Sequence, residues 1–300
     1  MTTRVWTSRF AALFSFMLVL PACEQVYGQT EWQQMLDSEL SQWESYLSYR
    51  FKLGYDGTVP KNKHGEDIAP IGVLPKPQDY GVFTVTAVDN EPDILRVSGE
   101  IYGGLTTKRS YRNYHLKLKM KWGEDVYSPR KKLLKDSGIL YHGIGEHGGE
   151  YWRSWMISQE FQIMKGHIGD YWNQSTTAID IRAFLPEYIM NPVADESQPF
   201  ISVGNGQDIK GFVLRKENHE KGEGEWNELE LICFEGKSLH IVNGEVVMVL
   251  KNSRNVDEKG VASPLVEGRI QIQSEAAEAY YKDIVIREIS NMPDSYSNLY

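Results

Sequence analysis

The chain has 300 residues and a formal net charge of −9 at pH 7, with acidic and basic residues interleaved along its length. No basic stripe is present, so nucleic acid is not an expected partner. Only two cysteines occur, Cys23 and Cys233, so a disulfide framework is excluded and a hydrophobic core must stabilise the fold.

The first residues have the pattern of an export signal. Arg4 and Arg9 precede an apolar run from Phe10 to Leu20, which is too short to span a bilayer comfortably. The sequence that follows, Leu-Pro-Ala-Cys23, resembles a bacterial lipobox, in which Cys23 is lipidated and becomes the mature N-terminus. Ordinary cleavage after Gly28 is the alternative.

These features predict a lipoprotein-type signal peptide over residues 1–22 and a linker over residues 23–34. The expected location is the bacterial cell envelope, as a periplasmic or outer-membrane lipoprotein, or outside the cell if cleavage follows Gly28. No later segment is apolar enough to cross a membrane, so a lipid at Cys23 is the expected membrane attachment.

Helix-periodic segments are scarce, and Glu31–Tyr49 is a candidate for one. Leu36, Leu40, Trp43 and Leu47 recur at helical spacing and predict an amphipathic helix.

Short runs rich in β-branched and aromatic residues then recur between Gly, Asn, Asp and Pro residues, which is typical of an all-β domain. In Tyr114–Trp122, three apolar residues alternate with His and Lys, as in a strand with one wet face. Asn243-Gly244 between two apolar runs predicts a type I′ hairpin turn. The other predicted strands are 82–88, 95–101, 139–142, 160–164, 212–215, 228–234, 268–273 and 283–287.

Two further segments complete the prediction. Residues 186–211 carry Pro, Asn and Gly and are expected to form a long loop over one face. Cys233 lies among apolar residues and is expected to be a buried, inert thiol. We expect one domain over residues 35–290 and a short tail over residues 291–300.

The most informative stretch is Ser158–Trp172. Side chains alternate across a strand, so Glu160 and Gln162 share one face while Phe161 and Ile163 share the other. Asp170, Tyr171 and Trp172 follow in a segment that can form the rim of a groove. Carboxylate, amide and flat aromatic groups on one surface are typical of a carbohydrate-binding site.

Taken in order, the motifs of this chain resemble the DUF1080 family, also called the 3-keto-disaccharide hydrolase domain, which has a concanavalin-like jelly-roll fold. The resemblance runs from about Met35 to Ile289. Its landmarks are Gly103–Lys108, Ser137–His142, Glu160–Ile163, Gly169–Trp172, Trp226–Glu228, Val242–Gly244 and Gly268–Gln273. The resemblance implies a sandwich of two antiparallel sheets and action on glycosides whose C3 hydroxyl is oxidised to a ketone.

Ordinary glycoside hydrolysis needs two carboxyl groups at a defined separation. The residue two positions after Glu160 is Gln162, which cannot ionise, so a second acid would have to be Asp170 or Glu275. A 3-keto sugar relaxes this requirement, because the ketone acidifies the C2 proton and one base can then start elimination at C1. A non-catalytic carbohydrate-binding lipoprotein and a conventional endo-glycanase are the alternatives.

Glu160 and His142 are the candidate catalytic residues; the alternatives are a solvated strand carboxylate and a structural histidine. Lys108 and Arg109 can polarise the ketone or simply be solvated. His147 and His167 could join His142 and Asp170 around a divalent ion, but no ligand spacing is diagnostic, so no metal or other cofactor is predicted. His240 and the basic run Arg130–Lys132 are expected to be structural and solvated, respectively. The candidate substrate-binding residues are Gln162, Asp170, Trp172, Lys108, Gln271, Gln273 and Glu275.

Overall fold

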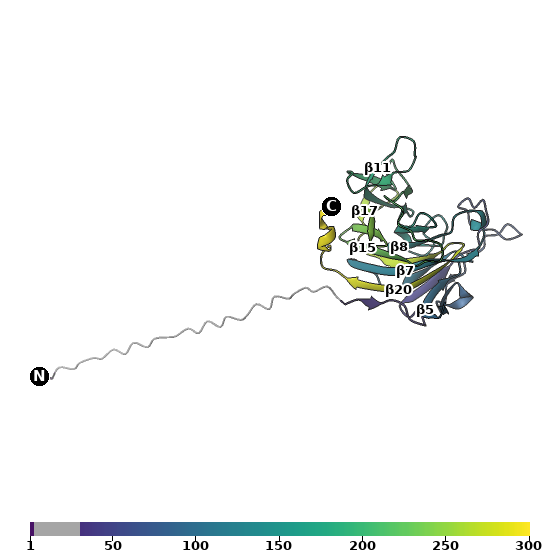
Figure 1. The fold of residues 1–300 in the computed structure, drawn as a ribbon, viewed down its shortest axis with the longest axis horizontal. Helices are drawn as coiled ribbons and strands as arrows, with labels where there is room; N and C mark the ends of the chain where they lie inside the picture. The colour runs from purple at the N-terminus through teal and green to yellow at the C-terminus, as the bar shows by residue number, and fades with distance from the viewer. Residues whose placement is uncertain (3–30) are drawn as a thin grey trace.

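The computed structural model describes residues 1–2 and 31–300 and consists almost entirely of antiparallel strands. Two sheets stack face to face as a concanavalin-like jelly-roll sandwich (Figure 1). The predicted all-β fold of two antiparallel sheets is therefore confirmed.

The first sheet has twelve strands, nine of them in one continuous path. In spatial order these are β12 (Val193–Ala194), β11 (Thr177–Phe184), β17 (Glu245–Val256), β16 (Lys237–Val242), β15 (Asn227–Phe234), β7 (Tyr114–Val126), β20 (Ala277–Glu288), β5 (Glu91–Val97) and β4 (Phe83–Val88). Three short strands pair beside this path: β1 (Gln33–Gln34) with β20, β13 (Phe200–Gly204) with β11, and β18 (Ala262–Pro264) with β17.

The second sheet has eight strands. Their spatial order is β14 (Phe212–Val213), β10 (Tyr171–Asn173), β9 (Ile157–Met164), β8 (Asp136–Ile144), β19 (Arg269–Ser274), β6 (Gly103–Thr107), β2 (Trp43–Leu47) and β3 (Gly72–Val73). The helical elements of the described chain are three short 3₁₀ turns, η1 (Asp79–Gly81), η2 (Arg130–Lys132) and η3 (Asp294–Leu299).

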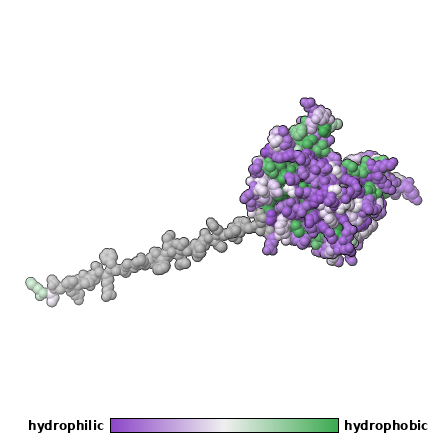
Figure 2. Space-filling view, viewed as in Figure 1, coloured by the Kyte–Doolittle hydropathy of each residue, from purple (hydrophilic) through white to green (hydrophobic). Residues whose placement is uncertain are grey.

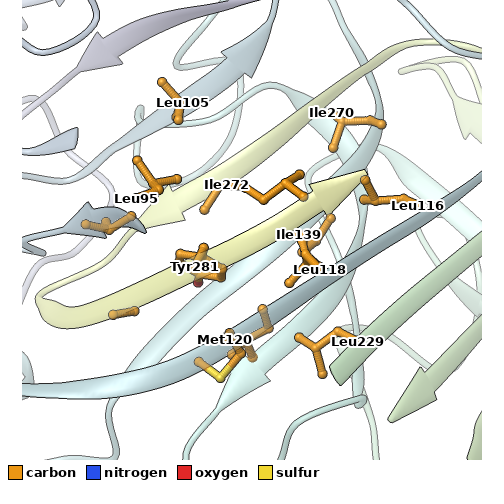
Figure 3. Packing of buried hydrophobic residues seen from close by; sticks show 14 of the residues in the cluster. Leu95, Leu105, Leu116, Leu118, Met120, Ile139, Leu229, Ile270, Ile272 and Tyr281 are labelled. Atoms are coloured by element: carbon orange, nitrogen blue, oxygen red, sulfur yellow. The ribbon is translucent and has the colours of Figure 1, made fainter. Parts of the chain in front are cut away.

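The main hydrophobic core fills the space between the two sheets (Figure 3). Leu116, Leu118 and Met120 of β7 enter it from the first sheet, as their alternation in the sequence predicts. Ile270 and Ile272 of β19 enter it from the second sheet. Because strand side chains alternate, the residues between these inward positions face away from the core.

The predicted hairpin is confirmed. Asn243 and Gly244 join β16 to β17, and their φ values of 52° and 89° are both positive. A type I′ turn needs positive φ at both central residues, which Asn and Gly adopt at low energetic cost.

The predicted helix over residues 31–49 is wrong, because this segment forms β1, a turn and β2. One carboxylate oxygen of Asp37 accepts the backbone N–H groups of Glu39 and Ser41, at 3.0 and 2.9 Å. Leu40 then adopts a positive φ of 53°, which a helix does not allow. Trp43 and Leu47 still enter the core, but they do so from a strand paired with β6.

The segment 186–211 is also more ordered than predicted. Instead of one long loop it contains β12 and β13, which both pair with β11 at the edge of the first sheet. The turn between β11 and β12 exposes large apolar side chains, and Figure 2 shows apolar surface where Figure 1 places the end of β11. These exposed residues are Phe184, Leu185, Tyr188, Ile189 and Met190.

The predicted signal peptide, the lipidation site Cys23 and the alternative cleavage after Gly28 lie outside the described residues. Within residues 31–300, no helix is both long and apolar enough to cross a membrane.

Candidate functional site

A cavity of about 560 Å³ lies on the outer face of the second sheet. Strand alternation places its floor: Phe161 and Ile163 of β9 enter the core, so Glu160 and Gln162 point the opposite way and line the cavity. The volume falls within the range of small-ligand sites. The predicted pair of an acid and an amide on one face of β9 therefore lines a hollow.

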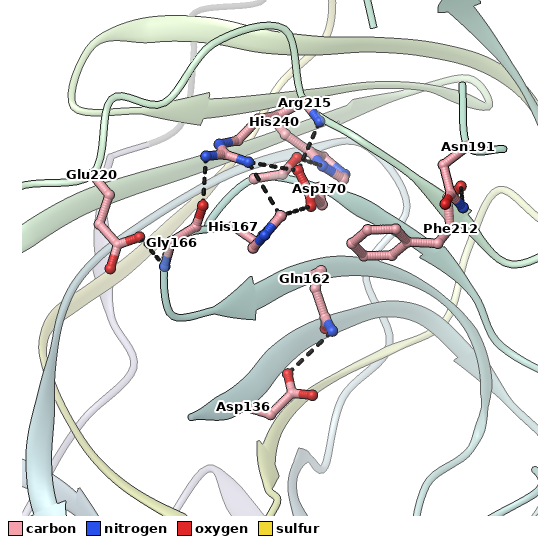
Figure 4. Close-up of polar contacts among 11 residues, drawn as sticks. Asp136, Gln162, Gly166, His167, Asp170, Asn191, Phe212, Arg215, Glu220 and His240 are labelled. Atoms are coloured by element: carbon pink, nitrogen blue, oxygen red, sulfur yellow. Dashed lines mark hydrogen bonds and ion pairs between the residues drawn. The ribbon is translucent and has the colours of Figure 1, made fainter. Parts of the chain in front are cut away.

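Three buried carboxyl groups and one guanidinium gather in this cavity. Asp136 begins β8, and its backbone forms an isolated antiparallel β-bridge with that of Glu275, which follows β19. Arg130 of η2 contacts both carboxylates through Nη2, with Glu275 Oε1 at 2.5 Å. The amide of Gln162 donates to Asp136 Oδ1 at 3.1 Å, as the lower part of Figure 4 shows.

Glu160 is the carboxyl without a cation in direct contact. Gln174 donates to Glu160 Oε2 at 2.5 Å, and the glutamate is only 2% exposed. Burial, followed by the negative charge of Glu275, raises the pKa of Glu160 well above its ordinary value, against the opposing hydrogen bond from Gln174. The ionised form of a carboxyl with a raised pKa is a stronger base than an exposed carboxylate.

Aromatic side chains form the walls of the cavity. Trp155 packs on Tyr102 and donates its indole N–H to the carbonyl of Gly103 at 2.7 Å. Trp172, which follows the floor strand on β10, is 41% exposed, and its ring lies 5.7 Å from that of Phe212. Flat apolar faces above hydrogen-bonding groups suit a sugar ring, which has an apolar face and a polar edge. The full aromatic lining is Tyr151, Trp152, Trp155, Trp172 and Phe212.

Glu150 holds the loop that carries three of these aromatic residues. Its carboxylate accepts the backbone N–H groups of Trp152, Ser154 and Trp155, at 2.5, 2.7 and 3.2 Å. Burial raises the pKa of Glu150 to about 7, and the three hydrogen bonds oppose that rise. The carboxylate therefore fixes the loop backbone, from which the indole rings of Trp152 and Trp155 project.

Two buried amides in this region have atoms without a protein partner. Oε1 of Gln162 has none, and neither amide atom of Gln273 has one. Both side chains are less than 10% exposed. Buried amides are normally hydrogen-bonded, so these atoms are available to a ligand or to water.

Gly138 leaves the room for this arrangement. A Cβ at this position would overlap both the carboxyl Oε1 of Glu160 and the side-chain oxygen of Gln273. The absence of a side chain therefore allows Glu160 and Gln273 to approach each other across β8.

The structure brings several of the predicted site residues together. Glu160, Gln162, Trp172 and Glu275 line the cavity. Gln273 is not among the lining residues, but its side-chain oxygen and that of Glu160 both lie next to Gly138. Gln271 shares this face but is fully buried, donating to Thr106 Oγ1 and accepting the backbone N–H of Met156.

Asp170 lies elsewhere, in a second polar cluster (Figure 4). Its carboxylate is fully buried and accepts the backbone N–H of Arg215 at 2.7 Å, with the Arg215 guanidinium at 3.3 Å and His167 Nδ1 at 2.9 Å. Asp170 does not line the cavity, and its oxygens are already engaged, so the predicted ligand contact does not match this position.

His142, the second predicted catalytic residue, lies outside the cavity. It is 1% exposed, packs against the rings of Tyr141 and Tyr114, and does not line the cavity. Burial lowers the pKa of His142 to about 4, so the ring is neutral at pH 7. The reason is a bulge: β8 changes register between Tyr141 and Ile144, and His142 adopts a positive φ of 54°.

The predicted ketone-polarising residues are also outside the cavity. Lys108 is exposed and donates to the carbonyl of Ser41, and Arg109 pairs with Glu288. The other histidines occupy separate places: His147 contacts Glu44, His167 contacts Asp170, and His240 is buried in the core side of β16. Among the described residues, no group of three or more His, Cys, Asp or Glu side chains is arranged to hold a metal ion.

Sequence reasoning missed several residues of the cavity. Arg130 was expected in a solvated loop, but only its neighbours Lys131 and Lys132 are exposed in this way, while Arg130 turns into the ion-pair cluster. Asp136 could have been found by extending the alternation of β8 back from Gly138. No local pattern distinguishes Gln174 or Glu150, because both act from loops whose path depends on distant strands.

A second hollow of about 700 Å³ lies against the first sheet, around Lys121 and Glu278. Glu278 there is paired with Arg96 at 2.7 Å and accepts the backbone N–H of Glu124 at 3.0 Å. Lys121 is paired with Asp89. Because the lining of this second hollow holds neither a buried carboxyl without a cation nor a comparable aromatic wall, the cavity on the second sheet is the better functional candidate.

The fold and the site define a carbohydrate-active β-sandwich protein. The family model of the 3-keto-alpha-glucoside-1,2-lyase-like domain matches residues 31–287, so the chain belongs to this family, as its motifs indicate. A sequence comparison with curated proteins finds no match.

Solved structures of similar proteins were also found. A candidate glycosyl hydrolase from Parabacteroides distasonis ATCC 8503 is 16% identical, with a TM-score of 0.45, over 87% of this chain and 100% of the other. A structure from work on endo-acting O-glycanases of the human gut microbiota is 11% identical, with a TM-score of 0.43, over 88% of this chain and 100% of the other. The carbohydrate-binding module CBM66 from Bacillus subtilis is 8% identical, with a TM-score of 0.36, over 69% of this chain and 96% of the other.

Proposed function

We propose that this protein cleaves 3-keto-glycosides, with Glu160 removing the C2 proton of the oxidised sugar. The observation that carries the proposal is a buried carboxyl of raised pKa on the floor of an aromatic cavity, beside two amides with unpaired atoms. Family membership supports the same class of substrate.

The chemistry follows from the ketone at C3, which makes the C2 hydrogen acidic. The Glu160 carboxylate takes this proton, and the electron pair of the C2–H bond forms an enolate whose negative charge rests on the C3 oxygen. When the enolate collapses, the C3 carbonyl reforms, a C1–C2 double bond appears, and the C1–O bond to the leaving group breaks. Addition of water across the new double bond then gives the hydrolysis product.

The residues around Glu160 can assist each step. The amide nitrogen of Gln273 has no protein partner and can donate to the enolate oxygen, and Oε1 of Gln162 can accept a hydrogen bond from a sugar hydroxyl. The protonated Glu160 can return its proton to the departing oxygen. Trp172 and Trp155 can stack on the ring and hold it over the floor. His142 has no part in this proposal.

The test compares a 3-keto-disaccharide with its unoxidised parent while the release of the aglycone is followed. Turnover of the keto sugar alone supports the proposal. Glu160→Gln is expected to reduce that turnover about 10²- to 10⁴-fold, which is the usual contribution of a positioned base. Glu223→Gln, which removes an exposed carboxylate outside the cavity, is the matched control and should leave turnover unchanged.

A non-catalytic carbohydrate-binding role is the second candidate, and the aromatic lining of the cavity favours it as much as it favours an enzyme. Binding of the keto sugar without turnover supports this role. Cleavage of the unoxidised parent supports a conventional glycosidase that uses Glu160 with Glu275 or Asp136.

The location is part of the proposal. Export by the N-terminal signal, with a lipid at Cys23, would place the domain in the cell envelope. Radiolabelled fatty acid incorporated into the wild-type protein, but not into Cys23→Ala, is the expected result; equal labelling of both would contradict it.

A further inference from the structure

The cavity holds three carboxyl groups and one cationic side chain. Asp136, Glu160 and Glu275 line it together with Arg130, which is the one cationic side chain that the described residues contribute to the lining. The charge that a ligand meets there depends on whether Arg130 is free to bind it.

Arg130 is already engaged. Its Nη2 contacts Asp136 Oδ2 and Glu275 Oε1, and its side chain is only 18% exposed. Burial opposes the charge, but Glu275 and Asp136 outweigh it and raise the pKa of Arg130, so the guanidinium remains ionised and paired. An anionic ligand group would therefore have to compete with two protein carboxylates for this cation.

The groups left for a ligand are neutral. Oε1 of Gln162 can accept a hydrogen bond, and the Gln273 amide can both donate and accept. These are the partners that hydroxyl and carbonyl groups need. They cannot balance the charge of a carboxylate, sulfate or phosphate group.

We propose that the cavity selects uncharged glycosides and excludes sugars that carry an anionic substituent. An anionic group entering this site would lose its hydration, face three carboxyl groups and find no uncommitted cation. The residues that set this preference are Asp136 and Glu275, which hold Arg130 between them. The inference rests on the proposed function only in taking the cavity as the sugar site.

Binding of two matched ligands tests the inference. The probes are methyl 3-keto-α-glucoside and the 3-keto form of the corresponding glucuronide, which differ only in the carboxylate at C6. Quenching of tryptophan fluorescence reports binding, because three indoles line the cavity. The glucuronide is expected to bind about tenfold or more weakly, and equal or tighter binding of the glucuronide would overturn the inference while leaving the proposed function intact. Absence of binding by both ligands would overturn both.

Variants of the carboxyl pair separate charge from shape. Asp136→Asn keeps the size of the side chain but releases one partner of Arg130, so the preference for the uncharged sugar should shrink severalfold. Glu275→Gln should act in the same direction if the first variant does not fold. Glu223→Gln, outside the cavity, should leave the ratio of affinities unchanged. An unchanged ratio in a folded Asp136→Asn or Glu275→Gln protein would show that charge is not the basis of selection.

Discussion

Two polar clusters lie near β9, one around Asp170 just before β10 and one that contains Gln162 and Asp136, and they differ in which polar atoms have partners (Figure 4). Around Asp170, the acceptors are satisfied by Arg215 and His167. Around Glu160, a carboxyl of raised pKa faces a cavity, and the neighbouring amides Gln162 and Gln273 keep atoms without partners.

This contrast separates polar groups with a structural role from candidate ligand-binding groups in one sheet. Both oxygens of the Asp170 carboxylate have partners, although Arg215 Nε has none among the described residues, and a buried charge paired in this way must not be disturbed. Around Glu160, by contrast, amide atoms lack hydrogen-bond partners next to an open cavity, which is a common feature of ligand-binding sites.

The largest effect on stability is expected at the satisfied cluster. Asp170→Asn removes the charge that compensates Arg215, and breaking a buried pair in this way costs about 3–5 kcal/mol. Denaturant unfolding measures the loss. Glu160→Gln is the matched variant in the cavity and should change the free energy of unfolding by about 1 kcal/mol or less. Similar losses in both variants would erase the distinction between the two clusters.

Gly138 tests the floor of the cavity. In Gly138→Ala the added Cβ would overlap Glu160 Oε1 and Gln273 Oε1, so we expect a loss of about 1–3 kcal/mol in stability and a far larger relative loss of turnover. Gly143→Ala on the same strand is the milder control, because the nearest atom to its Cβ lies 3.1 Å away. Full activity in a folded Gly138→Ala protein would contradict the placement of Glu160.

The buried carboxyls Glu160 and Glu150 should make the stability of the protein depend on pH. Burial raises the pKa of Glu160 and raises that of Glu150 to about 7, so each of these groups binds more protons in the folded state than in the unfolded chain between about pH 4.5 and pH 7. They therefore contribute a fall in the free energy of unfolding as pH rises through this window, whereas buried histidines of lowered pKa, such as His142, contribute a rise. Urea titrations at a series of pH values should show a more positive slope of the free energy of unfolding against pH in Glu160→Gln than in the wild-type protein. An unchanged slope in the variant would show that Glu160 is not desolvated.

The smallest effect is expected at the rim. Trp172→Ala removes an exposed stacking face, which is worth about 0.5–1.5 kcal/mol, so KM should rise severalfold with kcat little changed. Tyr188→Ala, another exposed aromatic residue that does not line the cavity, is the control. Equal kinetics in the two variants would remove Trp172 from the site.

Much of the fold could be predicted from the sequence because alternation is a local property. The inward residues of β7, β9 and β19 and the Asn243-Gly244 turn were all predictable from neighbours in the chain. The helix at residues 31–49 was wrongly predicted because spacing alone does not report the capture of backbone N–H groups by Asp37.

The site was predictable only in part. Alternation places Glu160 and Gln162 on one face, but it does not tell which outward positions meet a cavity, so Asp170 and His142 were indistinguishable from Glu160 as candidates. Arg130 was missed because a basic loop is usually solvated, whereas this guanidinium pairs with the buried carboxylates of Asp136 and Glu275, which lie far from it in sequence or on another strand. Such long-range contacts cannot be recognised from the spacing of residues along the sequence.

The most direct test is aglycone release by the wild-type protein and Glu160→Gln from a 3-keto-disaccharide and from its unoxidised parent. We expect release from the keto sugar alone, and a loss of about 10²-fold or more in the variant, which should remain folded. Wild-type rates in Glu160→Gln, or equal cleavage of both sugars, would contradict this expectation.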